Sequence, residues 1–315
     1  MNMNKTGGGL RRKRLLQRED IPLYIMSFPA VISLIIFSYL PMGGLVMAFQ
    51  NFNVTKGFAG SDFVGLKNFE FLFSSSDAFI ITRNTVLYNL AFIAVNLFLS
   101  VAVALILSEI RSKRSAKVFQ TIYMMPFFLS WAVVAILVSA FLDRSNGFVN
   151  QILGSAAGES VRINWYQRPE IWPALLVFVN AWKGVGYQTV LYLAVISGIS
   201  NDYYEAAVLD GATRFQQAKY ITIPHLRTII GISLIMSMGN IFRGDFGLFY
   251  NVTLDSGALY SVTDVIDTYI YRGLQSMGNL GMNAAAGFYQ SVVGLVMVVV
   301  SNKVISKIDP ESAMF

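Results

Sequence analysis

The chain alternates between long uncharged stretches and short segments that carry most of its charged residues. A helix needs about 20 mainly apolar residues to cross the roughly 30 Å hydrocarbon core of a bilayer. Six stretches approach or exceed that length, so the pattern predicts six membrane-spanning helices. Their approximate limits are 23–49, 84–108, 118–142, 171–199, 228–242 and 282–300.

Two of these stretches depart from a clean apolar pattern. The fifth is short, because it lies between Arg227 and Arg243, and the fourth contains Lys183. A lysine at the centre of a bilayer costs about 2.5–3.5 kcal/mol on insertion scales. We therefore expect Lys183 to face protein, water or an anionic ligand, unless a tilt or a break at Gly184 and Gly186 lets it reach the membrane surface.

Lysine and arginine predict the orientation of the chain in the membrane. They are concentrated in residues 1–20, in the loop between the second and third stretches, in the loop between the fourth and fifth, and after the sixth. Since such residues are enriched on the cytoplasmic side, both termini are expected in the cytoplasm. Residues 1–20 are interpreted as a basic cytoplasmic tail and residues 21–310 as the six-span membrane domain. The first apolar stretch is too long for a cleavable signal peptide.

Composition supports an all-α integral membrane protein and excludes several kinds of chemistry. Hydrophobic residues make up 55% of the chain and charged residues only 13%, against about 25% charged in soluble domains. With no cysteine and a single histidine, no thiolate-based or histidine-rich metal site is expected. No phosphate-binding P-loop or hydrolase motif occurs, so we expect no enzymatic activity. The net charge of +6 is explained by topology and predicts no nucleic-acid partner.

The loop at about 201–224 has the composition of two short helices joined by a glycine. Asp202 is a candidate cap for the first helix, with Glu205 completing a capping box. Gly211 permits the positive φ that ends this helix, and Thr213 can start the second. Pro224 suits the beginning of the fifth span. A helical hairpin outside the membrane, with no core of its own, is typical of a segment that docks into a groove on another protein.

This loop resembles the EAA loop of ABC-importer permeases. The motif residues are Glu205-Ala206-Ala207, Asp210-Gly211-Ala212 and Ile221-Thr222-Ile223-Pro224, with isoleucine where the family usually has leucine. The longer form of the motif is similar to the carbohydrate-uptake branch. The strings at 244–249 and 264–269 look like permeases for oligosaccharides and polysaccharide fragments, and the resemblance covers most of the chain.

The resemblance implies a type I ABC-importer transmembrane domain with six helices, in a bacterial cytoplasmic membrane. Spans two to six would surround the pore, with span one at the periphery. A second, non-identical permease would complete the pore, and an extracellular solute-binding protein would deliver an oligosaccharide. Two separate ATPase subunits would hold ATP-Mg, while this chain would bind no cofactor. Glu205 would anchor the loop on the ATPase and Gly211 would set its bend, together with Ala206, Ala207, Asp210 and Pro224.

Two helix faces are candidates for the sugar pathway. Asn180, Gly184 and Tyr187 share one face of the fourth span, at the position where the larger maltose permease is implied to hold its sugar. Ser237 and Asn240 share a face of the fifth, with Ser233 and Gly244. Lys183 departs from the neutral residue expected beside this face, which suggests an acidic sugar. The alternative is that these polar residues only hydrogen-bond neighbouring helices.

Two other functions remain open from the residues alone. An ion-coupled secondary transporter usually shows internal repeats and intramembrane carboxylates, neither of which is evident here. A non-transporting membrane scaffold or sensor could carry the same docking helix.

Overall fold

The computed structural model describes residues 21–110, 112–157, 161–275 and 280–308, and these residues are mostly helical. The basic tail at 1–20 lies outside the described residues. A short antiparallel hairpin, β1 (Gln50–Asn51) with β2 (Asp62–Phe63), follows the first span. The remaining short elements are α3 (Gly57–Gly60), η4 (Lys67–Phe69), α4 (Phe71–Ser74), α8 (Phe148–Ala157), η6 (Trp165–Gln167), η7 (Pro169–Ile171), η9 (Gly247–Val252), η10 (Gly257–Leu259), α13 (Tyr260–Thr263) and α14 (Ile266–Gln275).

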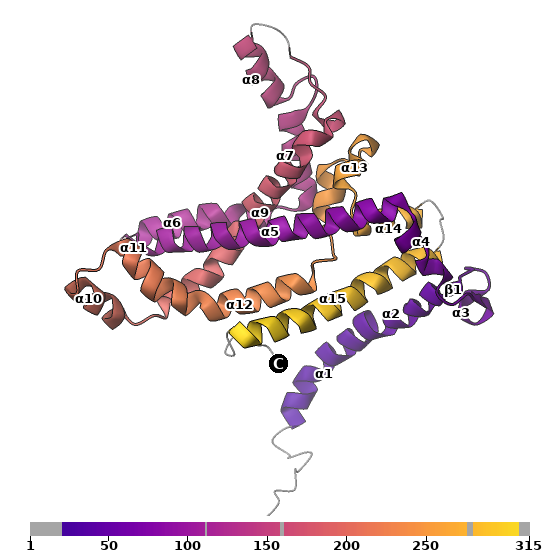
Figure 1. The fold of residues 1–315 in the computed structure, drawn as a ribbon, viewed down its shortest axis with the longest axis horizontal. Helices are drawn as coiled ribbons and strands as arrows, with labels where there is room; N and C mark the ends of the chain where they lie inside the picture. Colours follow the sequence, from indigo (N-terminus) through magenta and orange to yellow (C-terminus); the bar gives the residue numbers. More distant parts are fainter. Residues whose placement is uncertain (1–20, 111, 158–160, 276–279, 309–315) are drawn as a thin grey trace, which may run out of the picture.

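The first span is a peripheral helix. It runs without interruption through α1 (Ile21–Leu34), η2 (Ile35–Tyr39), α2 (Leu40–Met42) and η3 (Gly43–Phe49). Its most apolar window is 0% buried, and in Figure 1 α1 points away from the other helices. Only η3, at its end, packs closely against α15 (Leu280–Ile308). The side chains of residues 22–42 are exposed, so this apolar part of the span is suited to a lipid or partner-subunit environment.

Helices α5 (Ser76–Ser108) and α9 (Trp172–Ser197) form the centre of the molecule and pack along each other. Ser75 caps α5 by accepting a hydrogen bond from the Ala78 amide at 3.1 Å, so this helix begins before the predicted residue 84. The main buried cluster lies beside this pair, where Trp172 and Leu176 of α9 meet Val134 and Phe249.

The third predicted span is broken. Helix α6 (Lys113–Met124) and η5 (Met125–Phe128) end near Pro126, and α7 (Trp131–Leu142) leaves at an angle of 97°. Ser130 starts α7 by accepting a hydrogen bond from the Val133 amide at 3.3 Å. The predicted span over 118–142 is therefore a pair of helices and not a single helix, because a proline and a new N-cap interrupt a stretch that is apolar throughout.

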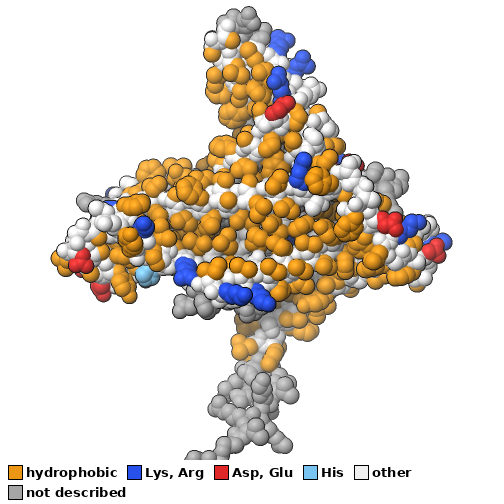
Figure 2. All heavy atoms as spheres, viewed as in Figure 1, with side chains coloured by type: hydrophobic (Ala, Val, Ile, Leu, Met, Phe, Trp, Pro, Cys, Tyr) orange, Lys and Arg blue, Asp and Glu red, His pale blue; other side chains and the backbone are white. Residues whose placement is uncertain are grey.

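The other predicted spans are single helices. In the described part of the chain, four helices are long and apolar enough to cross a membrane, and the bent pair makes a fifth. Helix α9 has sufficient length, with 26 residues, but its polar residues lower its mean hydropathy. All six predicted stretches are thus helical. Figure 2 shows a broad band of hydrophobic side chains on the visible face, with charged side chains mostly at its margins.

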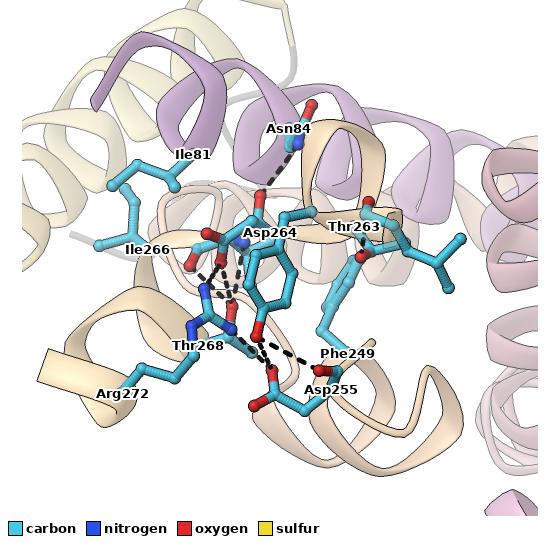
Figure 3. Close-up of polar contacts among 12 residues, drawn as sticks. Ile81, Asn84, Phe249, Asp255, Thr263, Asp264, Ile266, Thr268 and Arg272 are labelled. Carbon is cyan, nitrogen blue, oxygen red and sulfur yellow. Dashed lines mark hydrogen bonds and ion pairs between the residues drawn. The ribbon is translucent and has the colours of Figure 1, made fainter. Parts of the chain in front are cut away.

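The segment between α12 and α15 is held together by one arginine (Figure 3). The Arg272 guanidinium lies 2.5 Å from Asp264, 2.8 Å from Asp255 and 4.0 Å from the centre of the Tyr260 ring. Asn84 of α5 donates to the Asp264 carbonyl at 3.0 Å, which ties this cluster to the central helices. Burial raises the pKa of the Asp264 carboxyl, while the Thr268 hydroxyl and Arg272 oppose that effect.

Replacement of Arg272 by alanine is expected to lower the free energy of unfolding by about 3 kcal/mol, because it leaves two carboxylates close together without their cation. The thermal unfolding midpoint of the purified protein in detergent measures this loss. Arg168→Ala removes an exposed arginine as a control and should leave the midpoint nearly unchanged. Equal midpoints for the two variants would show that the cluster does not stabilise this segment.

Candidate functional site

The candidate docking loop consists of α10 (Asn201–Leu209), a turn at Gly211, and the beginning of a long helix. Ser200 caps α10, since its hydroxyl accepts a hydrogen bond from the Asp202 amide at 3.3 Å. The prediction that Asp202 is the cap is therefore wrong by two residues. Asp202 lies inside the first turn, where a negative charge favours the helix N-terminus.

Gly211 turns the chain as predicted, with φ of +79°. The Ala212 amide donates to the Ala207 carbonyl at 2.8 Å across this turn, a geometry that glycine adopts without strain. Thr213 then starts α11 (Arg214–Gln217) through a capping box with Gln216. The prediction of two helices joined by a glycine is confirmed.

The second helix of the loop continues into the fifth span without a break. It passes from α11 through a π-helical turn, η8 (Ala218–Thr222), into α12 (Ile223–Gly239), and forms one candidate span over Arg214–Gly239. Pro224 lies inside this helix and not at its beginning. The π turn immediately before it relaxes the usual hydrogen-bond register, which is one way a helix accommodates a proline.

The loop presents a mixed acidic and apolar surface. Glu205, Ala206 and Asp210 are exposed, and Glu205 forms no ion pair among the residues described. Val208 is 56% exposed and Leu209 is 88% exposed. Because Leu209 follows Glu205 by four residues, both lie on one face of α10. Helix α10 lies at one end of the molecule (Figure 1). Its exposed face combines the Glu205 carboxylate with the Leu209 side chain, a combination that suits binding to a protein partner.

Three contacts connect the loop to the rest of the protein. The Tyr204 and Thr222 hydroxyls are 2.9 Å apart, and the Tyr203 and His225 rings are 5.6 Å apart. Arg214 forms an ion pair with Glu109, at the end of α5, at 3.3 Å. Both partners of that ion pair are largely exposed, so it positions the loop more than it stabilises the fold.

The second candidate site is a polar cavity of about 420 Å³ between α5, α9 and α12. Its polar lining residues are Asn89, Asn96, Asn180, Gln188, Tyr192, Ser233, Ser237, Asn240, Arg243 and Asp245. Asn96 of α5 donates to the Asn180 side chain of α9 at 2.8 Å, so the two helices share one polar wall. Amides and hydroxyls in this density offer the donors and acceptors that a hydroxylated ligand requires.

The predicted pathway residues fall into two groups. Asn180, Ser237 and Asn240 line this cavity, as do Ser233 and Gly244. Lys183, Gly184 and Tyr187 are not among its lining residues. For Gly184, a Cβ atom would lie 3.7 Å from the Asn96 amide nitrogen, so this residue faces α5 just beside the cavity. Substrate contact stays a prediction for all six of the predicted pathway residues.

Lys183 and Tyr187 face the break in the third span. The Lys183 ammonium donates to the Phe127 carbonyl at 2.7 Å and lies 5.2 Å from the centre of the Trp131 ring. Tyr187 stacks on Phe127 with their ring centres 4.7 Å apart. These contacts give the intramembrane lysine a protein environment and explain how the chain tolerates it.

Sequence reasoning missed the α5 wall and the end of α12. Asn89 and Asn96 are seven residues apart and therefore share a helix face, a pattern that the sequence carries. Arg243 was interpreted only as the boundary of the fifth span, and Asp245 only as part of the string at 244–249. The strings at 244–249 and 264–269 prove to be joined, because the Gly244 amide donates to Asp267 at 2.5 Å.

A multi-span helical protein with a docking helix at one end and a polar cavity between its spans is a membrane permease. The chain belongs to the family of binding-protein-dependent transport system inner membrane components, whose family model matches residues 96–309. This membership decides against the ion-coupled transporter and the non-transporting scaffold. It also places the chain in the inner membrane.

Two relatives illustrate the family. The polygalacturonan/rhamnogalacturonan transport system permease YteP of Bacillus subtilis is 32% identical over 303 residues, covering 96% of this chain and 93% of YteP. The trehalose/maltose transport system permease MalF of Thermococcus litoralis is 28% identical, covering 92% of this chain and 96% of MalF.

The fold is that of a solved importer. A crystal structure of a bacterial ABC transporter that imports the acidic polysaccharide alginate contains a chain with 33% identity and a TM-score of 0.80, and the match covers 93% of this chain and 97% of that one. The alginate transporter in complex with its pentasaccharide-bound periplasmic protein gives 34% identity and a TM-score of 0.82, covering 92% and 96%. The type I importer architecture expected from the sequence is confirmed.

Proposed function

We propose that this chain is one permease subunit of an ATP-driven importer for acidic oligosaccharides. The observation that carries this proposal is the cavity rich in amides and hydroxyls between α5, α9 and α12. Full-length similarity to permeases for polygalacturonan and alginate supports the acidic class, since both polymers are built from uronic acids. The chain offers groups that bind and position a sugar, and transport needs no bond to be made or broken on it.

The importer would contain further subunits. A second permease would face this one and close the pathway, and a binding protein would deliver the sugar from outside. Two ATPase subunits would hold ATP-Mg and receive the exposed face of α10, with Glu205 as the anchor. Ala207 and Gly211 would fix the shape of this helix and its turn. Closure of the ATPases would then move the docking loop and switch the cavity between inward-facing and outward-facing states.

Uptake into proteoliposomes tests the proposal. The chain is purified with its cognate permease, ATPases and binding protein, and entry of a labelled galacturonate or alginate oligosaccharide is followed. We expect uptake that requires both ATP and the binding protein and that exceeds uptake of a neutral maltooligosaccharide of equal length. Uptake driven by an ion gradient without ATP would contradict the transport mechanism. A preference for the neutral sugar would contradict the substrate class.

A further inference from the structure

The cavity wall carries two charged residues whose surroundings differ. Asp245 accepts a hydrogen bond from the Leu248 amide at 3.2 Å, and the Lys183 ammonium attracts its carboxylate. The Asp245 carboxylate is therefore held mainly by a backbone donor of the following turn, and it forms no ion pair among the described residues.

Arg243 has no such arrangement. Its side chain is exposed, and its guanidinium forms no hydrogen bond or ion pair among the described residues. Asp267 is the carboxylate that it influences at longer range. That carboxylate already accepts from the Gly244 amide at 2.5 Å and from Gln290 at 3.0 Å. Arg243 is thus the cation of the cavity that keeps its donors available.

The backbone around Arg243 is fixed from several sides. Asn89 of α5 donates to the carbonyls of Ile241 at 3.1 Å and of Arg243 at 3.0 Å. Gln290 of α15 donates to the Phe242 carbonyl at 2.8 Å. These bonds from two other helices fix the backbone from which the Arg243 side chain extends, so no backbone ordering is needed when the side chain binds a ligand.

Arg243 also lies between two hollows. It lines the polar cavity between α5, α9 and α12, and it lines a second cavity of about 360 Å³ between α12 and α15. It follows the end of α12 that is remote from the docking loop. A sugar delivered from outside therefore meets Arg243 before it reaches Ser237 and Ser233, which lie deeper along α12.

We propose that Arg243 is the residue that binds the carboxylate of an acidic sugar at the outer end of the translocation pathway. Its planar guanidinium matches a carboxylate through two parallel hydrogen bonds, which gives geometric selectivity as well as attraction. Asn240 and Asn89 beside it are placed to bind the hydroxyls of the same sugar unit. This inference rests on the proposed function and assigns to Arg243 the charge recognition that the sequence suggested for Lys183.

The test uses the complete importer in proteoliposomes with two matched ligands. One is a galacturonate oligosaccharide, and the other is the same oligosaccharide with its carboxyl groups reduced to alcohols. Initial uptake rates are measured for the native protein, Arg243→Gln, Arg243→Lys and Lys183→Gln. Arg168→Gln removes an exposed charge as the control. Because one binding protein delivers each ligand in every arm, the ratio of variant to native rate isolates the contribution of the permease.

Arg243→Gln should reduce uptake of the acidic oligosaccharide about tenfold or more and change uptake of the reduced one less than about twofold. Arg243→Lys should recover part of the acidic uptake, since it restores charge without the planar fork. Lys183→Gln should affect both ligands alike, and Arg168→Gln neither. Equal losses of both ligands in Arg243→Gln, or no loss of either, would overturn the assignment.

The two proposals fail in distinguishable ways. If the native importer does not prefer the acidic ligand, the proposed substrate class is wrong whatever Arg243 does. If the native importer prefers the acidic ligand and Arg243→Gln keeps that preference, only the assignment of Arg243 is wrong. Co-purification of the second permease and the ATPase subunits with Arg243→Gln, in native proportions, establishes that the assembly is intact.

Discussion

Glu205→Lys should reduce ATP-dependent uptake by at least about 30-fold while the permease remains folded. The side chain is exposed on α10 and forms no ion pair within the described chain, so its reversal removes nothing that holds this protein together. On a docked ATPase, the same change would place a lysine where a carboxylate is accommodated. Uptake and co-purification of the ATPase subunits measure the two consequences.

The control for this prediction is Glu170→Lys, which makes the same charge change at an exposed site before the start of α9, whereas α10 follows the end of that helix. It should leave both uptake and ATPase association near native values. If Glu205→Lys retains native uptake and ATPase binding, α10 is not the element that couples the two subunits. If Glu205→Lys lowers the thermal unfolding midpoint so much that the protein is unfolded under the conditions of the uptake assay, Glu205 has a structural role instead.

Gly186→Ala should destabilise the protein by about 3 kcal/mol and sharply lower the yield of folded material. Gly186 is buried in α9, and a Cβ atom there would lie 1.9 Å from the Tyr123 carbonyl oxygen of α6. The obstacle is backbone, so no rotation of a side chain relieves it, and α6 and α9 would have to separate. Small residues allow membrane helices to approach this closely.

Gly184→Ala is the matched control on the same helix. Its new methyl group would lie at an ordinary contact distance of 3.7 Å from Asn96, and alanine favours a helix by about 1 kcal/mol over glycine. The thermal midpoint in detergent should therefore stay equal or rise for Gly184→Ala and fall strongly for Gly186→Ala. Similar midpoints for the two variants would mean that the close approach of α6 and α9 contributes little.

Hydrophobic length and turn chemistry were enough to predict the helices and the docking loop. Uncharged stretches located helices at all six predicted positions, the third of them as a bent pair, because burial in lipid requires apolar side chains along a helix. Gly211 and Thr213 located the turn and second helix of the loop, because each has a specific backbone or capping role. The error at Asp202 arose because Ser200, two residues earlier, is an equally good cap.

Other features could not be predicted from the sequence because they depend on which helices pack against one another in the folded protein. The bend at residues 125–130 lies within uniformly apolar sequence, so hydropathy does not change there, although Pro126 was a local sign. Helical periodicity placed Asn180 and Tyr187 on one face of α9, but different parts of that face contact two different neighbouring elements. Asn180 meets the Asn96 side chain, whereas Tyr187 meets Phe127. Which part of a helix face meets a cavity is decided by the packing of the other helices.

The unbroken helix from Arg214 to Gly239 has a mechanical consequence. Its 26 residues make a lever about 39 Å long, with the docking loop at one end and Ser237 of the cavity near the other. For a rod of this length, a tilt of about 5° displaces the far end by roughly 3 Å, about the length of a hydrogen bond. A small displacement at the docking-loop end is therefore sufficient to change which groups face the cavity, without any helix unwinding.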